Sequence, residues 1–430
     1  MKKHITLSFL LFFFPFASIV VQAQDTSYVR SIITQLASPD LHGRGYVKKG
    51  EKKAAKLLKQ EIEKIGLQAF EPGYTQEFSF PINTFPRNVS VSVDDKKLTP
   101  GVDYLLRGDA PSTRGTYQIA WINQKVVEHE DALVNMINNV DKDYFIAIDT
   151  TGIRNETILE LIQFIRAENP TKASGIIWIH HGKLVYRPYK EQSKFPTLQM
   201  KPEALSPDAQ EIKIKARARF YKKYTTQNLV AYHPGQVDTF IVMVAHYDHI
   251  GRMGKDCYFP GANDNASGSA ALLDFARHIG QKENQAYYSY AFIWFGAEET
   301  GLLGSKFYTE NPYFPLNQIK YLFNYDMVGT GDEGLSIVNA LSHPEVFARM
   351  EAMNEQHQFF ESVRGGKGSA NSDHYYFTTH DVPSFFFFTR GKFKAYHDIT
   401  DKAENLPLSG YHAFFGFIAQ FLSEVEQLRY

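Results

Sequence analysis

The sequence has almost no cysteine and no excess of either charge, and each shortage excludes a class of protein. Cys257 is the only cysteine in 430 residues, so no disulfide can form within the chain. We interpret it as an inert buried thiol, because neither a nucleophile motif nor a second zinc-binding cysteine accompanies it. Basic and acidic residues number 46 and 47, which gives a formal net charge of -1. Nucleic-acid-binding proteins carry a basic excess, so nucleic acid is not expected as a partner.

Long apolar runs are absent beyond the N-terminal segment. Residues 1–23 contain a short basic start, an apolar stretch at 7–21 and the small residue Ala23 before Gln24. This order predicts a secretory signal peptide that is removed on export. No later run of about 18 apolar residues follows, so no membrane span is expected in the mature chain. The mature protein is therefore expected in the periplasm or outside the cell.

The mature chain shows two different patterns of predicted strands and helices. Short strand-like runs fill residues 86–226 around one amphipathic helix, and the alternation of apolar and basic residues at 212–220 predicts a single half-buried strand. From Asn228 onward, apolar strands alternate with amphipathic helices, which predicts an α/β sandwich with a largely parallel sheet. We therefore predict an α/β domain made of residues 24–85 and 227–430, with residues 86–226 inserted as a separate lobe.

Histidines and carboxylates follow the strands of the α/β domain. The strands are predicted at 239–245, 291–295, 322–325 and 383–388. The groups that follow them, or that precede the next helix, are His246, Asp248, His249, Asp264, Glu298, Glu299, Asp326, Tyr396 and His397. Each group alone could belong to a solvated loop. Ligands of open α/β sheets bind outside the carboxyl ends of the strands, so these loops are expected to meet at one edge.

The chemistry of these side chains indicates a metal centre. Carboxylates gathered at one sheet edge repel one another unless a cation offsets their charge. Nitrogen and oxygen ligands without a thiolate suit zinc, and the number of groups is sufficient for two ions that share one carboxylate. Asp248 lies two residues after His246, where its carboxylate could accept a hydrogen bond from the imidazole and orient it.

Several motifs occur together over residues 228–405. They are Ala245 to Gly251, Gly261 to Gly268, Gly296 to Ser305, Asn324 to Gly329, Ser372-Asp373-His374, and Tyr396-His397 with Asp401. Together they resemble the co-catalytic di-zinc aminopeptidases, within the superfamily of glutamate carboxypeptidases, glutaminyl cyclases and the transferrin receptor ectodomain. The resemblance implies the zinc exopeptidase fold, a three-layer α/β sandwich with a mostly parallel mixed central sheet. The inserted lobe resembles a protease-associated domain.

The resemblance also implies a role for each matching residue. His246 and Asp326 would hold one zinc ion, Glu299 and His397 the other, and Asp264 would bridge the two. Three further residues would take part in catalysis: Glu298 as general base, Asp248 by orienting His246, and Tyr396 as a donor to the oxyanion, although a packed aromatic ring explains Tyr396 equally well. Asp373, His374 and Asp401 would support the ligands or serve the structure, and we interpret His249 and His380 as structural.

The favoured function is that of a secreted zinc-dependent aminopeptidase, which hydrolyses N-terminal residues from peptides with a metal-bridging water. A glutaminyl cyclase would use the same scaffold with one zinc ion. A carboxypeptidase would need a basic pocket for the substrate carboxylate, and the candidates for it are Arg364, Lys367, Arg390, Lys392 and Lys394. A non-catalytic relative would be expected to lack ligands or the base, and none of these is missing.

Overall fold

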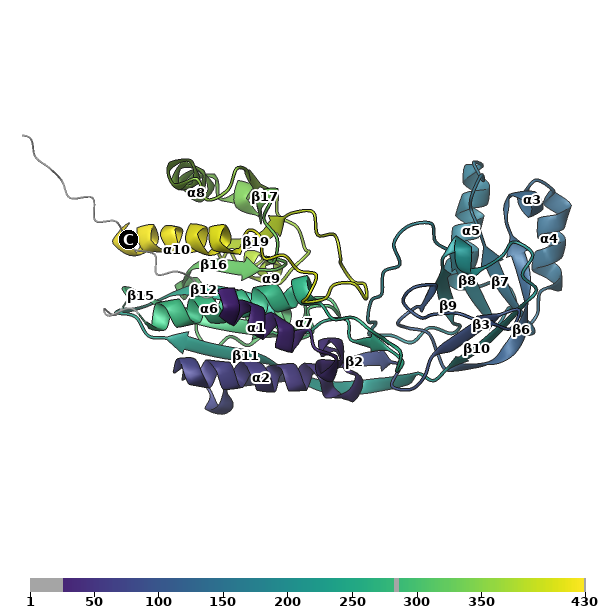
Figure 1. The fold of residues 1–430 in the computed structure, drawn as a ribbon, viewed down its shortest axis with the longest axis horizontal. Coiled ribbons are helices and arrows are strands. Elements are labelled where there is room, and N and C mark those ends of the chain that lie inside the picture. The colour runs from purple at the N-terminus through teal and green to yellow at the C-terminus, as the bar shows by residue number, and fades with distance from the viewer. Residues whose placement is uncertain (1–25, 282–285, 429–430) are drawn as a thin grey trace, which may run out of the picture.

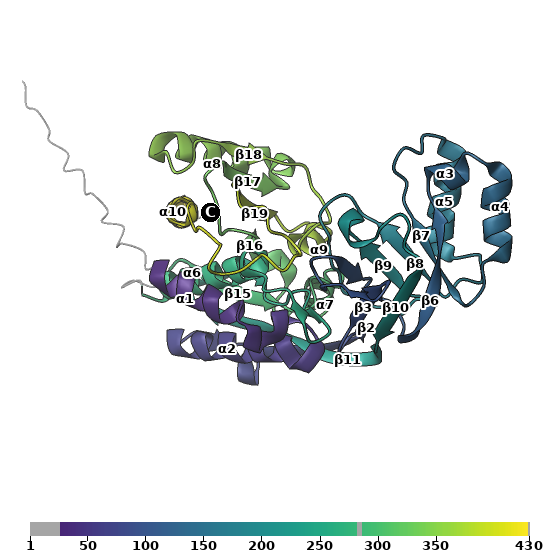
Figure 2. The same cartoon turned by 45° about the vertical axis from the view of Figure 1, so that its right-hand side comes forward.

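A computed structural model describes residues 26–281 and 286–428, and the predicted signal peptide, residues 1–23, lies outside the described residues. Figures 1 and 2 show two lobes, each built around its own β-sheet. Two antiparallel partner strands, β2 (Thr75–Thr84) and β11 (Arg219–His233), run between the lobes. Within the described ranges, no helix is long and apolar enough to cross a membrane.

The larger lobe contains a nine-stranded mixed sheet with the order β1-β11-β15-β12-β16-β19-β17-β18, and β2 pairs with β11. Its four central strands are parallel, whereas β11 and β17 are antiparallel to their neighbours β15 and β19. The remaining bounds are β1 (Gln68–Ala69), β12 (Val237–His246), β15 (Tyr288–Phe295), β16 (Ile319–Tyr325), β17 (Gly334–Val338), β18 (Val363–Gly365) and β19 (Ser384–Arg390).

Helices cover both faces of this sheet, as the predicted three-layer sandwich requires. The larger core packs one face of the sheet against α1 (Thr26–Leu36), α2 (Gly50–Ile65), α6 (Gly268–Gly280), α8 (Pro344–His357) and α10 (Tyr411–Leu428). A smaller core packs the other face against α7 (Leu303–Glu310) and α9 (His374–Thr378). Alternate residues of one strand serve the two cores, as with Met243 and Val244 of β12, because successive side chains of a strand point to opposite faces.

The order of the strands determines where the loops meet. β12 lies between β15 and β16 in the sheet. After β12 the chain forms β15 on one side of it, and it then forms β16 on the other side. Such a reversal opens a crevice at the carboxyl ends of the strands. His246 is the last residue of β12 and therefore lies at this point.

The smaller lobe contains an eight-stranded sheet with the order β4-β3-β10-β6-β7-β8-β9-β5. Its elements are β3 (Ser90–Val93), β4 (Lys96–Lys97), β5 (Tyr104–Leu106), β6 (Thr113–Ile122), α3 (Gln124–Val127), α4 (Glu130–Asn139), β7 (Tyr144–Ile148), α5 (Glu156–Glu168), β8 (Gly175–Ile179), β9 (Thr197–Met200) and β10 (Glu211–Ala216). A separate two-stranded sheet pairs β13 (Arg252–Met253) with β14 (Cys257–Tyr258).

The prediction of one strand at 212–220 is wrong. The chain forms β10 up to Ala216, and β11 begins at Arg219. β10 pairs with β3 and β6 in the smaller sheet, whereas β11 pairs with β2 and then β15. The alternation of apolar and basic residues continues across the break, although Phe220 at the start of β11 is exposed, and the pattern therefore does not reveal a change of sheet.

Cys257, the one cysteine of the chain, is buried in the core of the smaller lobe. Burial raises the pKa of its thiol to about 12. Because only the thiolate is nucleophilic, this agrees with an inert structural role.

Glu51, in the first turn of α2, is a fully buried carboxyl group. One of its oxygens accepts a hydrogen bond of 2.7 Å from the Tyr224 hydroxyl, and burial raises its pKa from 4.5 to about 7. Between these two pH values the folded state holds a proton that the unfolded state has released, so stability falls as the pH rises through this window.

We expect Glu51→Gln to remove this dependence, because the amide stays neutral. We subtract the free energy of unfolding of the natural protein from that of the variant. This difference should rise by about 3 kcal/mol between pH 5 and pH 8. Denaturant titrations at several pH values measure it. The exposed Glu63→Gln is the matched control on the same helix and should give no such trend. Parallel curves for the natural protein and Glu51→Gln would contradict the assignment.

Candidate metal centre

His246 heads the first of two groups of side chains at the crevice. Its Nε2 lies 3.4 Å from Asp264 Oδ1 and 3.4 Å from Asp326 Oδ1. Its Nδ1 donates a hydrogen bond of 3.2 Å to the main-chain oxygen of Asp248. Because Nδ1 carries the proton, Nε2 keeps its lone pair for the crevice, as a metal-binding imidazole requires.

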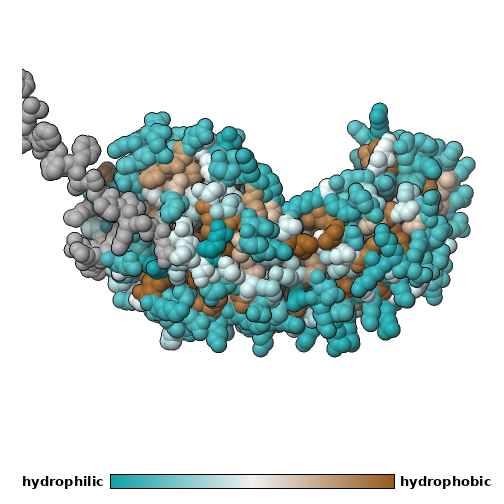
Figure 3. All heavy atoms as spheres, in the orientation of Figure 1, coloured by the Kyte–Doolittle hydropathy of each residue, from teal (hydrophilic) through white to brown (hydrophobic). Residues whose placement is uncertain are grey.

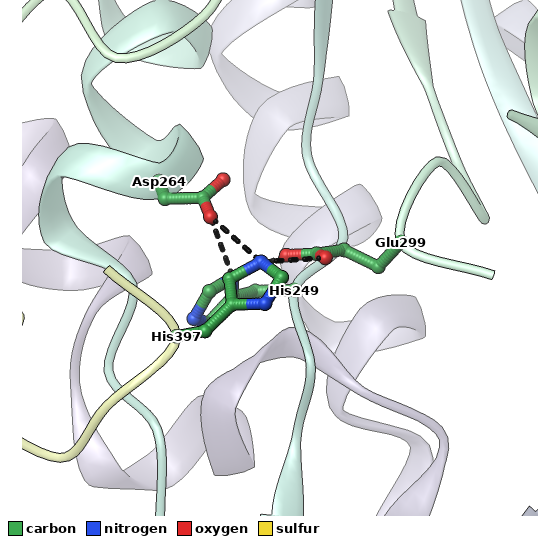
Figure 4. A group of neighbouring side chains, drawn as sticks. All are labelled: His249, Asp264, Glu299 and His397. Carbon is green, nitrogen blue, oxygen red and sulfur yellow. Dashed lines mark hydrogen bonds and ion pairs between the residues drawn. The ribbon is translucent and has the colours of Figure 1, made fainter. Parts of the chain in front are cut away.

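His397 heads the second group, shown in Figure 4. Its Nε2 lies 2.9 Å from Glu299 Oε2 and 3.1 Å from Asp264 Oδ2. Asp264 therefore faces both groups, with one carboxylate oxygen toward His246 and the other toward His397. This is the arrangement that a carboxylate shared by two cations needs.

The donor atoms of each group are close enough to hold one ion. The atoms of His246, Asp264 and Asp326 lie within 4.8 Å of one another, and so do those of His249, Asp264, Glu299 and His397. All the donors are nitrogen or carboxylate oxygen, and the residues are buried or nearly so, which fits zinc.

The two adjacent glutamates have opposite electrostatic environments. Burial, with Glu299 and nearby aspartates, raises the pKa of Glu298 well above its ordinary value, and His246 opposes this only in part. For Glu299, burial acts in the same sense, but His397 and the hydrogen bond from His249 outweigh it and lower the pKa to about 2. Glu298 therefore holds a proton more readily than its neighbour, as a general base must.

A turn of the backbone separates the side chains of Glu298 and Glu299. Adjacent residues at a strand end point apart, whereas β15 already ends at Phe295. Glu298 and Glu299 instead begin a turn in which the main-chain oxygen of Glu298 accepts hydrogen bonds of 2.8 Å from Gly301 and Leu302. Glu298 Oε2 lies 3.9 Å from His246 Nε2, and Glu299 faces His397.

Asp248 is buried beneath Glu298. Its Oδ1 accepts a hydrogen bond of 3.1 Å from the main-chain N–H of Glu298, and its Oδ2 accepts one of 3.1 Å from the Tyr46 hydroxyl. Its carboxylate lies 3.8 Å from His246 Nδ1, which is too long for a hydrogen bond. The main-chain oxygen of Asp248 therefore orients the imidazole, and its carboxylate fixes the backbone of Glu298.

The side chain of Arg44 holds the loops of the crevice together. Its guanidinium is fully buried and donates to five main-chain oxygens. The acceptors are those of Leu36, Tyr247, Pro260, Gly261 and Asp264, at 2.7–3.1 Å. All five N–H donors of the guanidinium are thus used, and they tie the loops after β12 to the segment that carries Asp264.

The backbone around Arg44 fits closely against the loop after β12. Gly43 has φ of +67°, and its main-chain oxygen accepts a hydrogen bond of 3.0 Å from Gly251 N–H. A Cβ at position 43 would come within 2.4 Å of the main-chain oxygens of Gly251 and Phe259. Glycine is therefore required both by the left-handed conformation and by the close approach.

Further side chains hold the carboxylates in place. Asp401 accepts the main-chain N–H groups of Asn263 and Asp264, at 2.8 and 3.1 Å, and Ser372 donates a hydrogen bond of 2.8 Å to Asp326 Oδ2. Asp373 and His374 are fully buried beside this arrangement.

Tyr396 lies at the mouth of the site. Its side chain is 39% exposed, and its ring stacks on that of His397 with centroids 3.9 Å apart. It lines a cavity of about 280 Å³. The other lining residues are His246, Asp264, Glu298, Glu299, Asp326, Met327, Asn371, Phe386, Phe388 and His397.

The sequence does not indicate the contacts of Arg44 and Tyr46, and His249 is interpreted from it only as a structural residue. The Nδ1 of His249, however, donates a hydrogen bond of 2.7 Å to Glu299 Oε1 inside the second group. Its position three residues after His246 was the available signal. His380 lies at the end of α9, outside both groups.

The sequence of residues 228–422 matches Peptidase family M28, which confirms the predicted resemblance for this part of the chain. Two curated proteins are similar over shorter stretches. Leupeptin-inactivating enzyme 1 of Streptomyces exfoliatus is 38% identical over 26% of this chain and 24% of its own length. Leucine aminopeptidase 1 of Arthroderma otae is 28% identical over 42% of this chain and 50% of its own length. The chain thus spans between a quarter and a half of these relatives.

A solved structure, that of the zinc aminopeptidase BSAP from Bacillus subtilis, is similar over almost the entire chain. The TM-score is 0.68 at 21% sequence identity, and the match covers 93% of this chain and 95% of that one. At this identity the similarity establishes the fold, and it confirms the predicted α/β sandwich.

Proposed function

We propose, from the match of residues 228–422 to Peptidase family M28, that this chain is a zinc-dependent aminopeptidase. The observation that carries the proposal is the position of Asp264, whose two carboxylate oxygens face two separate groups of metal-binding atoms. In the proposal, His246 and Asp326 hold one zinc ion, Glu299 and His397 hold the other, and Asp264 bridges them. Bound zinc would make water more acidic and polarise the carbonyl group of a peptide.

Glu298 is the proposed general base. It belongs to neither group of close donor atoms, and its raised pKa gives it the proton affinity that the role needs. Its carboxylate takes a proton from the attacking water as the new C–O bond forms. It then gives this proton to the leaving nitrogen as the peptide C–N bond breaks. Asp248 keeps Glu298 in place through the hydrogen bond to its main-chain N–H.

The charges of the cavity favour the N-terminus of a peptide over its C-terminus. Among the described residues, no lysine or arginine lines the cavity, whereas four carboxylates do. With zinc bound, the ions would offset these carboxylates, and a substrate carboxylate would still find no basic side chain of the cavity to bind, whereas a substrate ammonium group could contact carboxylate oxygens. The basic residues between Arg364 and Lys394 lie outside the lining, so the carboxypeptidase alternative loses its support.

The remaining wall of the cavity is apolar. Met327, Phe386 and Phe388 lie beside the two metal groups. An apolar side chain at the substrate N-terminus, such as that of leucine, would be desolvated against this wall, and we propose that such residues are preferred.

The test combines metal analysis with a panel of substrates. We expect two zinc ions per chain by mass spectrometry of the purified protein and rapid hydrolysis of leucine anilide, with loss of turnover after chelation and recovery with zinc. Peptides with an N-terminal glutamine are the control for the cyclase. A single bound zinc ion combined with cyclisation, and no release of amino acids, would refute the aminopeptidase assignment.

We further propose that residues 1–23 direct export to the periplasm or the cell exterior and that the exported chain begins at Gln24, which N-terminal sequencing would test.

The division of the chain into an α/β domain and an inserted lobe at residues 86–226 is also a proposal. It is supported by the second sheet, although β11 runs through position 226 without a break. The role of this lobe as a protease-associated domain belongs to the same proposal.

A further inference from the structure

The smaller lobe contains a cavity of its own, of about 410 Å³. Strands β5, β8 and β9 form its floor, α5 contributes Arg166, and residues 185–189 form the remaining side. Figure 3 shows that the molecule is hollowed between the two lobes, on the face that this view presents. The lining includes three arginines, Arg107, Arg166 and Arg187, together with His180 and Trp178.

The positive charge of this cavity is only partly neutralised. Arg107 donates from two nitrogens to the carboxylate of Asp109. Within residues 26–281 and 286–428, neither Arg166 nor Arg187 has a carboxylate within 4.0 Å. Arg107 lies close enough to Arg166 to act on its pKa, which burial and this like charge both lower. Two arginines that line one cavity, with no carboxylate of the described residues within 4.0 Å, would gain stability from an anion.

The side chain of Arg166 and the main chain of Arg187 are held in position. The guanidinium of Arg166 lies flat against Trp178, 4.4 Å from the ring centroid, so its edge stays available. Gly108 allows the backbone of Arg187 to approach, because a Cβ at position 108 would lie 2.1 Å from the Arg187 main-chain oxygen. Arg187 itself is exposed. A planar guanidinium with a free edge binds carboxylates through paired hydrogen bonds.

The same segment connects this cavity to the metal centre. Tyr186 lines the cavity, and its main-chain N–H donates a hydrogen bond of 3.5 Å to the His397 main-chain oxygen. Lys183, at the start of the segment, forms an ion pair of 2.6 Å with Asp398 and donates to the Lys394 main-chain oxygen. The cavity and the metal centre are therefore joined by direct main-chain contact between residues 186 and 397.

We propose that this cavity binds a carboxylate of the peptide substrate, downstream of the residue that is removed, and that the enzyme therefore prefers acidic peptides. The carboxylate is supplied by an aspartate or glutamate side chain of the peptide. The proposal rests on the aminopeptidase function proposed above, and it gives the smaller lobe a part in substrate selection.

The experiment compares short leucyl peptides that differ only in glutamate or glutamine at one downstream position, in a series of lengths with amidated ends. We expect a higher kcat/KM for the glutamate peptide at one length. Arg166→Met and Arg187→Met should each reduce this preference about tenfold, the effect of losing one charge-assisted hydrogen bond. Leucine anilide has no residue after the leucine, so the natural protein and both variants should hydrolyse it equally.

Lys194→Met is the matched control, because Lys194 is an exposed basic residue seven positions after Arg187 and does not line the cavity. Arg166→Met removes a packing contact on Trp178, so its fold is checked by circular dichroism. Arg187→Met removes only an exposed side chain and keeps the test valid if Arg166→Met unfolds. Equal kcat/KM for the two peptides at every length, or a preference that survives both substitutions, would overturn the proposal.

Two further measurements show whether the cavity binds the peptide substrate or a separate effector. Calorimetry with the glutamate peptide and the full-length Glu298→Gln chain, with and without Arg187→Met, tests binding without turnover, so a failure of the proposed aminopeptidase function would not hide the site. Binding that is lost in Arg187→Met supports the proposal, and no binding refutes it. If free succinate changes the hydrolysis of leucine anilide in the natural protein but not in Arg187→Met, the cavity is an effector site, and the substrate proposal fails.

Discussion

Glu298→Gln is expected to lower kcat for leucine anilide by about 10²–10⁴-fold while zinc stays bound. The amide is similar in size to the carboxylate and keeps the main-chain hydrogen bond to Asp248, but it cannot accept a proton. Because Glu298 belongs to neither group of close donor atoms, zinc content measured by mass spectrometry should be unchanged.

Glu299→Gln is the natural comparison, since the two residues are adjacent and chemically identical. Glu299 contacts both His397 and His249, and its ionised form is favoured there. Its replacement should lose one zinc ion per chain at moderate zinc concentration, with activity restored by excess zinc. If the two variants show the same metal content and the same response to added zinc, the division of roles between them is wrong.

Arg44→Met is expected to reduce the free energy of unfolding by about 3–5 kcal/mol. The substitution leaves five main-chain oxygens without their donors in a buried place, and it removes the cation beneath the carboxylates of Asp264, Asp401 and Asp248. Denaturant unfolding of the zinc-loaded protein and of the chelated protein measures the loss with and without the contribution of the metal.

Arg44→Lys separates geometry from charge. A lysine keeps the charge but has three donors at one point, so it cannot reach acceptors that surround a planar group, and we expect it to lose most of the same stability. The exposed Arg364→Met is the control and should change the free energy by no more than about 0.5 kcal/mol. A stability of Arg44→Lys close to that of the natural protein would show that charge alone matters at this position.

The fold was predictable where burial leaves a continuous or periodic apolar pattern. The predicted strand at 291–295 is the end of β15, which begins three residues earlier at Tyr288. That start was hidden because Ser289 interrupts the apolar run, although its hydroxyl donates to the Val237 main-chain oxygen and it is buried. The positions of the ligands followed from the strand ends, because parallel strands deliver the residues after them to one edge.

The residues that were missed act through contacts between distant segments. Arg44 lies 203 positions from Tyr247, whose oxygen it binds, and no local pattern indicates a buried arginine that serves five carbonyl groups. The arginines of the smaller lobe come from a helix, a strand end and a loop, so their convergence likewise depends on the tertiary fold. His249 has a sequence signal, but only the fold shows which carboxylate it meets.

The single buried cysteine has a practical consequence for measuring the distance between the two lobes in solution. With a pKa of about 12, the Cys257 thiol is ionised at neutral pH to an extent on the order of 10⁻⁵ and is shielded from reagents by the core. The natural chain is thus almost inert to maleimide dyes. One cysteine introduced on the surface of each lobe would carry the only reactive thiols, and energy transfer between two attached fluorophores would show whether the distance between the lobes changes when a peptide binds.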